Sequence, residues 1–306
     1  MANNTSEHSF NIIEEVLYAE LPLIAPSSLV LSEAELTPED SAEPEVTTSL
    51  TYAQDNVTTE VIENNVPNSY TNDFYGVEIK NGTDYELTED ILNPSSLNIN
   101  TSDIIIFHTH TCESYTQSEN YQYEESGTFR TIDLERSVVK VGSELTNYLV
   151  SYGFKTTHDT TYHDYPSYSG SYGRSMATVQ NLLLSQPRTD IILDLHRDAI
   201  ADTSYAPSVK IGDEIAAQLM FVIGTDGGGL EHPNWQNNLK FAVLVQQKAN
   251  ELYPGLFKPI ILRNSRYNQQ LGNAACIIEV GATGNTLDQT LVSMKYLSKI
   301  LNEALK

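Results

Sequence analysis

The stretch that decides the fold is Ile104-Ile105-Ile106-Phe107-His108-Thr109-His110-Thr111-Cys112-Glu113. Its first four residues are β-branched or aromatic and apolar, which predicts a buried strand. Two histidines follow at the end of that strand, and a carboxylate comes three residues after the second. A His-x-x-Glu turn can place His110 and Glu113 around one ion, since zinc prefers nitrogen and oxygen donors in a tetrahedral set.

Two later apolar strands carry polar residues of the same kind. Residues 191–195 are followed by His196, and Glu279 lies inside the apolar run 277–280. A catalytic zinc site uses three protein ligands and keeps one position for water, so we expect His196 to be the third ligand. Burial should raise the pKa of Glu279 toward the working range of a general base. The four residues together predict a zinc-dependent hydrolase.

The choice between the two strand-end histidines stays open on the sequence alone. His108 and His110 are two residues apart on a strand, so their side chains point the same way. The spacing to Glu113 favours His110 as the ligand. His108 then lies behind the ligands or faces the substrate.

The run 158–168 is the densest polar and aromatic stretch of the chain. Such a run suits a loop that lines a carbohydrate or peptide groove, and equally a loop that packs on itself. We expect His158, in this run, to lie near the substrate. Arg197, Arg263 and Arg266 are expected to clamp a substrate carboxylate or to polarise a carbonyl, with surface ion pairing as the alternative for all three.

Strands and helices alternate along residues 103–305. This order predicts an α/β fold with a mixed, mostly parallel sheet covered by helices on both faces. Ligands of such sheets bind beyond the C-terminal strand ends, where His110 and His196 fall. We also expect a hairpin between residues 208–211 and 219–223. The predicted strands are 103–109, 154–158, 191–195, 208–211, 219–223, 260–263 and 275–280, and the predicted helices centre on 138–149, 176–183, 235–252 and 287–305.

The charge is distributed very unevenly. Residues 1–100 hold 19 acidic side chains against the single basic residue Lys80, which leaves only −6 of the chain's net charge of −24 to residues 101–306. An acidic segment rich in Thr, Ser and Asn is typical of a solvated tail. We therefore predict a flexible N-terminal region over 1–65 and a catalytic domain over 66–306.

The same composition excludes several partners. A strongly acidic chain is not attracted to nucleic acid or to an anionic membrane surface. No run of about 18 apolar residues predicts a bilayer span, and the N-terminus lacks the basic start of a secretory signal. Cys112 and Cys276 are too few for a disulfide framework.

Taken together, these motifs resemble the stage II sporulation protein P family of cell-wall hydrolases. The resemblance covers roughly residues 86–306, and the combination of stretches is specific although each one alone is not. The matching stretches are His108–Tyr115, Ser137–Gly142, His158–Ser175, Asp194–Ala199, Arg266–Gln269, Ile278–Gly281 and Gly284–Leu287.

The resemblance implies a zinc-dependent N-acetylmuramoyl-L-alanine amidase fold. The substrate would be peptidoglycan, cut between the lactyl group of N-acetylmuramic acid and L-alanine, with endopeptidase activity on stem-peptide crosslinks as a second activity. It also implies an extracytoplasmic place during engulfment and a lytic transglycosylase partner of the stage II sporulation protein D type. Carried over to this chain, His110 and His196 take the metal and Glu279 is the catalytic carboxylate, while Arg174 is expected near the substrate.

Two departures from the family pattern bear on these expectations. The usual N-terminal membrane anchor is absent from this sequence, which indicates either a shortened chain or an unusual member of the family, and we expect membrane association of the full-length protein. The related broader amidase group takes its ligand glutamate from the start of the first helix, where this chain offers Glu135. The His-x-x-Glu spacing favours Glu113 over Glu135.

Two other functions are compatible with these residues. A zinc carboxypeptidase uses the same His-x-x-Glu, distant histidine and carboxylate, together with an arginine for the free C-terminus. A catalytically silent module that binds cell-wall glycan is the alternative outside the enzymes, although a pure binder has no use for a buried Glu279 beside a metal.

Overall fold

The computed structural model describes residues 58–62 and 69–306. Apart from 58–62, the N-terminal region predicted over 1–65 lies outside the described residues, and its flexibility stays a prediction. None of the helices in the described part combines the length and the apolar composition that crossing a bilayer requires.

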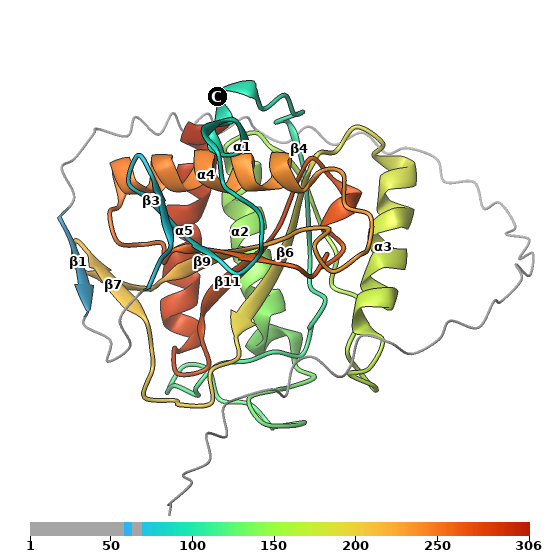
Figure 1. The fold of residues 1–306 in the computed structure, drawn as a ribbon. Coiled ribbons are helices and arrows are strands. Elements are labelled where there is room, and N and C mark those ends of the chain that lie inside the picture. Colours follow the sequence, from blue (N-terminus) through green and yellow to red (C-terminus); the bar gives the residue numbers. More distant parts are fainter. Residues whose placement is uncertain (1–57, 63–68) are drawn as a thin grey trace, which may run out of the picture. The chain divides into compact units, whose positions relative to one another are not determined.

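An eight-stranded sheet forms the centre of the described chain (Figure 1). Two neighbouring pairs are antiparallel, β2 with β3 and β9 with β11, and all the others are parallel. The prediction of a mixed, mostly parallel sheet is therefore confirmed. In spatial order the strands are β2 (Asn72–Phe74), β3 (Val77–Asn81), β10 (Ile260–Arg263), β9 (Leu219–Gly224), β11 (Ala274–Ala282), β6 (Ile191–Asp198), β4 (Asp103–Phe107) and β5 (Lys155–His158).

The continuous apolar run of β4 is explained by burial on both of its faces. Ile104 and Ile106 pack into the larger core cluster, whereas Ile105 and Phe107 join a second cluster with Val179 of α3. Successive side chains of a strand point to opposite faces, so a strand covered on both sides needs apolar residues throughout.

Helices cover the two faces unequally. Residues of α2 (Val138–Ser151), α4 (Trp235–Leu252) and α5 (Leu287–Ala304) share the larger core. The long helix α3 (Ser171–Ser185) packs on the other face, and Figure 1 shows it on the opposite side of β6 from α2. The short helix α1 (Glu89–Leu92) follows the β2–β3 hairpin. The expectation of helices on both faces is met, with only α3 among the long helices on the second face.

A small separate sheet corrects one predicted pairing. β7 (Ser208–Ile211) pairs with β8 (Glu214–Ala217) and with β1 (Thr59–Ile62), not with residues 219–223 as expected. Gly212 has a φ of 61°, which is the left-handed conformation that a two-residue hairpin turn needs. The chain therefore reverses at once after β7, and residues 219–224 are left to join the main sheet as β9.

Truncation would test the boundary between the N-terminal region and the folded domain. A chain beginning at residue 58 is expected to be as stable as the full chain, because the removed acidic segment cannot build a core. A chain beginning at residue 66 also loses β1 and should be less stable by about 1–2 kcal/mol, since its four cross-strand pairs with β7 disappear. Urea unfolding measures both differences. Equal losses in the two truncated chains would contradict this boundary.

Candidate active site

The predicted site residues meet where β4, β6 and β11 run side by side. His110 and Glu113 lie in the turn that follows β4, and a backbone bond from Glu113 N to His110 O (3.0 Å) closes that turn. His196 lies within β6, two residues before its end, and Glu279 is its direct partner on β11. Parallel pairing of these strands therefore brings side chains from three distant parts of the sequence to one edge of the sheet.

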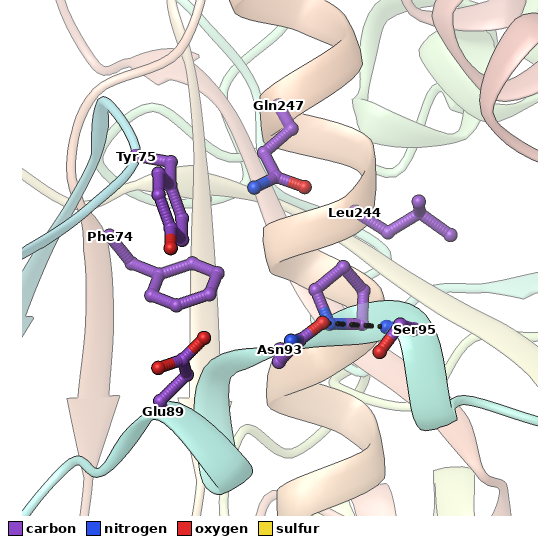
Figure 2. A pocket seen from close by; sticks show the side chains of 8 residues that line it. Phe74, Tyr75, Glu89, Asn93, Ser95, Leu244 and Gln247 are labelled. Atoms are coloured by element: carbon purple, nitrogen blue, oxygen red, sulfur yellow. Dashed lines mark hydrogen bonds between the residues drawn. The ribbon is translucent and has the colours of Figure 1, made fainter.

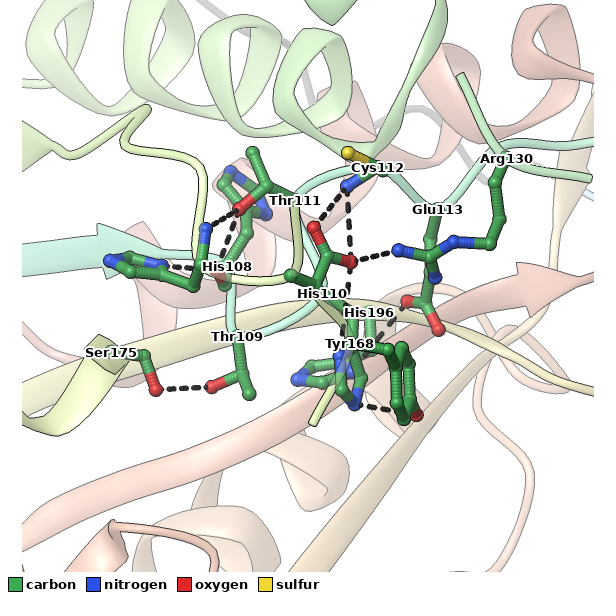
Figure 3. Close-up of polar contacts among 12 residues, drawn as sticks. His108, Thr109, His110, Thr111, Cys112, Glu113, Arg130, Tyr168, Ser175 and His196 are labelled. Carbon is green, nitrogen blue, oxygen red and sulfur yellow. Dashed lines mark hydrogen bonds and ion pairs between the residues drawn. The ribbon is translucent and has the colours of Figure 1, made fainter. Parts of the chain in front are cut away.

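His110, Glu113 and His196 form a buried group of nitrogen and carboxylate donors (Figure 3). The two imidazole rings are 5.2 Å apart, centroid to centroid, and nearly perpendicular. His196 Nδ1 lies 3.6 Å from Glu113 Oε2. These donor types are those that a catalytic zinc ion prefers.

Two ring nitrogens in this group are buried without a hydrogen-bond partner among the described residues. They are Nδ1 of His110 and Nε2 of His196. The nearest carboxylate oxygens lie 3.9 Å away, on Asp164, and 3.0 Å away, on Asp194, without hydrogen-bonding geometry. Buried polar atoms are rarely left unpaired in proteins, so the donor set fits a ligand such as a metal ion. Within residues 58–62 and 69–306, however, no group of three or more His, Cys, Asp or Glu side chains is placed closely enough to hold a metal ion as it stands.

The two members of each open pair of candidate ligands lie in different surroundings. His108 uses its two ring nitrogens elsewhere, on Leu195 O (3.0 Å) and on His158 Nε2 (2.8 Å). The carboxylate of Glu135 is exposed and accepts from Lys140 Nζ at 2.8 Å. His110 and Glu113 are thus the members of each pair that lie beside His196.

The electrostatics of the site are dominated by burial and by its carboxylates. Burial opposes charging of His196, but Asp194 and Glu113 outweigh it and raise the pKa of His196 to about 10. Burial, together with the positive charges of His196 and the nearby arginines, holds the pKa of His110 well below its usual range. The carboxylates of Asp194 and Glu113 thus favour a positive charge at His196, as they would favour a bound cation.

Glu279 has the environment that the sequence predicted for it. Burial raises the pKa of its carboxyl group to about 8, against the opposing charge of His196. Its Oε2 lies in the interior without a partner among the described residues, although the residue as a whole is partly exposed. The carboxylate is therefore near His196 and is not engaged in a structural bond through that oxygen.

The predicted arginines are placed differently from one another. Arg197 is buried beside the site: its backbone N–H donates to Glu113 Oε2 (3.1 Å), and its guanidinium donates to Thr283 Oγ1 (2.7 Å). Arg174 donates to the carbonyl oxygens of His163 and Ser167, so it holds the loop before α3. Arg266 donates to the backbone oxygen of Glu231 (3.2 Å). A substrate contact for these three stays a prediction.

Four further residues of the site were not singled out by sequence reasoning. Buried Asp194 accepts from the backbone N–H and the hydroxyl of Thr109, at 2.8 and 2.6 Å. Buried Asp164 accepts from Cys112 N (3.1 Å) and from Arg130. Asp194 carries the same signal as Glu279, a carboxylate inside an apolar strand, and could have been found by it, whereas nothing in the sequence marks Arg130.

The fourth of these residues comes from the polar and aromatic run 158–168. Tyr168 stacks on the ring of His110, with centroids 4.5 Å apart, and its hydroxyl is 3.0 Å from His110 Nε2. This contact favours the interpretation of the run as a loop that lines the site.

The structure also contains an open pocket remote from these residues. It has a volume of about 320 Å³ and lies among the β2–β3 hairpin, the residues around α1, and α4 (Figure 2). None of the predicted site residues lines it. Its lining residues are Phe74, Tyr75, Glu89, Asn93, Pro94, Ser95, Leu244 and Gln247.

Comparison with known proteins places the chain in a family. Residues 13–302 match the family described as stage II sporulation protein P. The chain belongs to this family. It is 26% identical over 213 residues to stage II sporulation protein P of Bacillus subtilis (strain 168), a match that covers 65% of this chain and 50% of that protein. The chain thus spans about half the length of the curated relative it matches.

Similar solved structures are cell-wall amidases, at low identity. The CwlD amidase from Clostridioides difficile, solved in complex with the GerS lipoprotein, is 12% identical, with 67% of this chain and 94% of that chain covered and a TM-score of 0.41. The amidase Ami1 from Mycobacterium smegmatis is 13% identical, with 67% and 96% covered and a TM-score of 0.38.

In this chain, a glycine of α2 makes room for the His108–His158 pair. A Cβ atom on Gly142 would lie 2.5 Å from His158 Nε2 and 2.7 Å from His108 Nε2. The helix can therefore lie directly against the two imidazoles only because residue 142 has no side chain.

We predict opposite effects for alanine at two helical glycines. Gly142→Ala should lower the free energy of unfolding by about 1–3 kcal/mol, because the new methyl group overlaps both imidazoles. Gly173→Ala, on α3, meets nothing within 4 Å and should raise it by about 0.5–1 kcal/mol through helix propensity. Urea unfolding of the two variants checks this, and a stabilised Gly142→Ala variant would show that the histidine pair does not constrain α2.

Proposed function

We propose that this chain is a zinc-dependent peptidoglycan hydrolase, an N-acetylmuramoyl-L-alanine amidase that cleaves the amide between N-acetylmuramic acid and L-alanine. One observation carries the proposal. Glu279 faces His196 across the β6–β11 pair, and Nδ1 of His110 and Oε2 of Glu279 are buried without a hydrogen-bond partner among the described residues. Unpaired buried groups of this kind destabilise a protein unless a ligand satisfies them.

Zinc would be held by His110, Glu113 and His196 and, when bound, would polarise the scissile carbonyl and lower the pKa of a water molecule. The protein fixes these side chains from outside. Tyr168 holds the ring of His110 through Nε2, and the backbone N–H of Arg197 holds the carboxylate of Glu113. Such outer contacts set the orientation of metal ligands.

Glu279 is the proton carrier of the proposed reaction. Its carboxylate takes a proton from the water that attacks the carbonyl carbon of the lactyl group. The carbon–nitrogen bond then breaks, and the same proton passes to the nitrogen of L-alanine, which leaves as a neutral amine. The free Oε2 of Glu279 supports this role, since no structural partner has to be displaced.

Further parts of the proposal follow from the family. We propose that residues 66–306 form the catalytic domain, that the protein acts outside the cytoplasmic membrane during engulfment, and that its full-length form is membrane-associated. A lytic transglycosylase of the stage II sporulation protein D type would be its partner. Cleavage of stem-peptide crosslinks would be a second activity of the same site.

A zinc carboxypeptidase would use the same donors on a different substrate. It would need an arginine for the C-terminal carboxylate. The guanidinium of Arg197 donates to Thr283 through Nη1, while its Nε has no hydrogen-bond partner among the described residues. Activity assays on intact sacculi and on short peptides distinguish the two functions. Release of L-alanine amino groups from sacculi supports the amidase, and hydrolysis confined to short free peptides would replace it with the carboxypeptidase.

The metal assignment predicts a difference between two glutamates. His196→Ala and Glu113→Ala should each abolish stoichiometric zinc, because each removes one of three ligands from a buried site. Glu135→Ala is the matched control and should keep about one zinc per chain, since Glu135 pairs with Lys140 at the surface. Elemental analysis of purified protein measures this, with circular dichroism as the folding check. Full zinc occupancy in the Glu113→Ala variant would refute the ligand set.

Replacing Glu279 by glutamine tests the mechanism. The change keeps shape and length but removes the proton acceptor, so zinc should stay bound while turnover on purified muropeptides falls by about 10²–10⁴-fold. Loss of zinc would instead make Glu279 a ligand. Near-normal turnover would show that Glu279 is a purely structural residue and would refute the mechanism. It would also remove the argument that a buried Glu279 favours an enzyme over a silent glycan-binding module.

A further inference from the structure

Two successive residues beside the candidate site have an unusual backbone conformation. Tyr267 and Asn268 both lie in the left-handed region, with φ of 51° and 61°. Asparagine tolerates this region, whereas a bulky residue such as tyrosine is strained there. Strain of this kind persists only where the surrounding structure holds it, and it is concentrated at ligand sites.

Side-chain hydrogen bonds of Asn268 hold this turn against the start of α3. Its Nδ2 donates to Tyr172 O at 2.7 Å and to Ser175 Oγ at 3.2 Å. Ser175 Oγ is in turn 2.9 Å from Thr109 Oγ1, in the turn that carries His110. The position of Tyr267 is thereby coupled to the strand end on which the candidate site is built.

Tyr267 extends a row of aromatic rings away from His110. The ring of Tyr172 meets the ring of His110 edge-on at 5.7 Å, and the ring of Tyr267 lies 6.0 Å from that of Tyr172. Tyr267 also packs against Met220 and Ile277, and these lie on the same sheet face as Glu279, because Met220 pairs with Glu279 and Ile277 is two residues before it. The two tyrosines therefore lie between the proposed metal ligand and the apolar surface next to the proposed proton carrier.

The hydroxyls of this tyrosine pair are not used by the protein. Tyr172 and Tyr267 are both partly exposed, and neither hydroxyl has a hydrogen-bond partner in the described ranges. An aromatic ring with a free hydroxyl offers one apolar face and one hydrogen bond to a ligand.

Two arginines lie close to the pair in the sequence, and both are hydrogen-bonded to backbone oxygens. Arg174 donates to the carbonyls of His163 and Ser167, and Arg266 donates to that of Glu231. The pair itself offers aromatic faces and hydroxyl groups to a ligand. A pyranose ring presents a C–H face for an aromatic ring and hydroxyls for the phenols.

We propose that Tyr172 and Tyr267 form the subsite that binds the sugar ring of the substrate, the N-acetylmuramic acid of the glycan strand. This proposal rests on the proposed function, because it names which half of the substrate lies on this side of Glu279. Tyr267 is a substrate-positioning residue, and the bonds of Asn268 maintain the strained turn that presents it.

The test compares binding of two half-substrates by isothermal titration calorimetry. One is a peptide-free oligomer of alternating N-acetylglucosamine and N-acetylmuramic acid, and the other is the free stem peptide. Tyr267→Ala should weaken binding of the glycan about tenfold and leave binding of the peptide unchanged. Tyr267→Phe, which keeps the packing on Met220 and Ile277, should weaken glycan binding by a smaller factor and guards against misfolding.

Tyr75 provides a matched control. It is also a tyrosine in the left-handed region, with φ of 50°, but it is 77% exposed in the β2–β3 turn and lines the remote pocket of Figure 2. Tyr75→Ala should leave binding of both half-substrates unchanged. On intact muropeptides, Tyr267→Ala should raise KM about tenfold with little change in kcat, because a uniform binding contact is lost.

The outcomes separate this proposal from the proposed function. Unchanged glycan binding in Tyr267→Ala, with normal hydrolysis by the unaltered chain, overturns the sugar subsite alone. Weaker binding of the peptide in place of the glycan also overturns it and assigns the pair to the peptide. A third outcome is that the unaltered chain hydrolyses no peptidoglycan although Tyr267→Ala still weakens its binding of the glycan. This result would overturn the proposed function, and the sugar subsite would stand.

Discussion

The buried carboxylate of Asp194 is the interaction on which the candidate site depends. It accepts two hydrogen bonds from Thr109 and lies 3.0 Å from His196 Nε2. A buried carboxylate is strongly unfavourable unless it is hydrogen-bonded or paired. Because β6 supplies Asp194 and the turn after β4 supplies its partners, this requirement fixes the position of that turn relative to the strand that carries His196.

A second buried carboxylate, that of Asp164, also holds this turn. Asp164 accepts from Cys112 N and from Arg130, whose guanidinium lies 5.3 Å from the ring of Tyr168. The segment from His110 to Glu113 is therefore held by hydrogen bonds and ion pairs, whereas the strand before it is held by apolar packing. Sites that must present polar groups to a ligand commonly depart from the apolar packing of the rest of a core.

The apolar pattern was sufficient to find the main elements. The runs that begin at Ile104, Ile191 and Leu219 are too apolar for exposed loops. A strand that is buried on both faces is apolar throughout, so it is easily recognised in the sequence. The pairing of β7 was wrong because pattern alone does not say which neighbouring strand a hairpin uses. The left-handed Gly212 decided that, and its effect is visible only in the backbone.

The candidate residues divide in the same way. The sequence alone determined the donor types of His110, Glu113, His196 and Glu279 and their positions on or after apolar strands. A polar residue in or beside an apolar strand is easily recognised in a sequence. Tertiary structure alone decided that His108 bonds His158 and that Glu135 faces solvent. It also placed Arg130, Asp164 and the Tyr172–Tyr267 pair, since contacts between residues dozens of positions apart depend on strand order and turn geometry. Local sequence patterns carry no record of either.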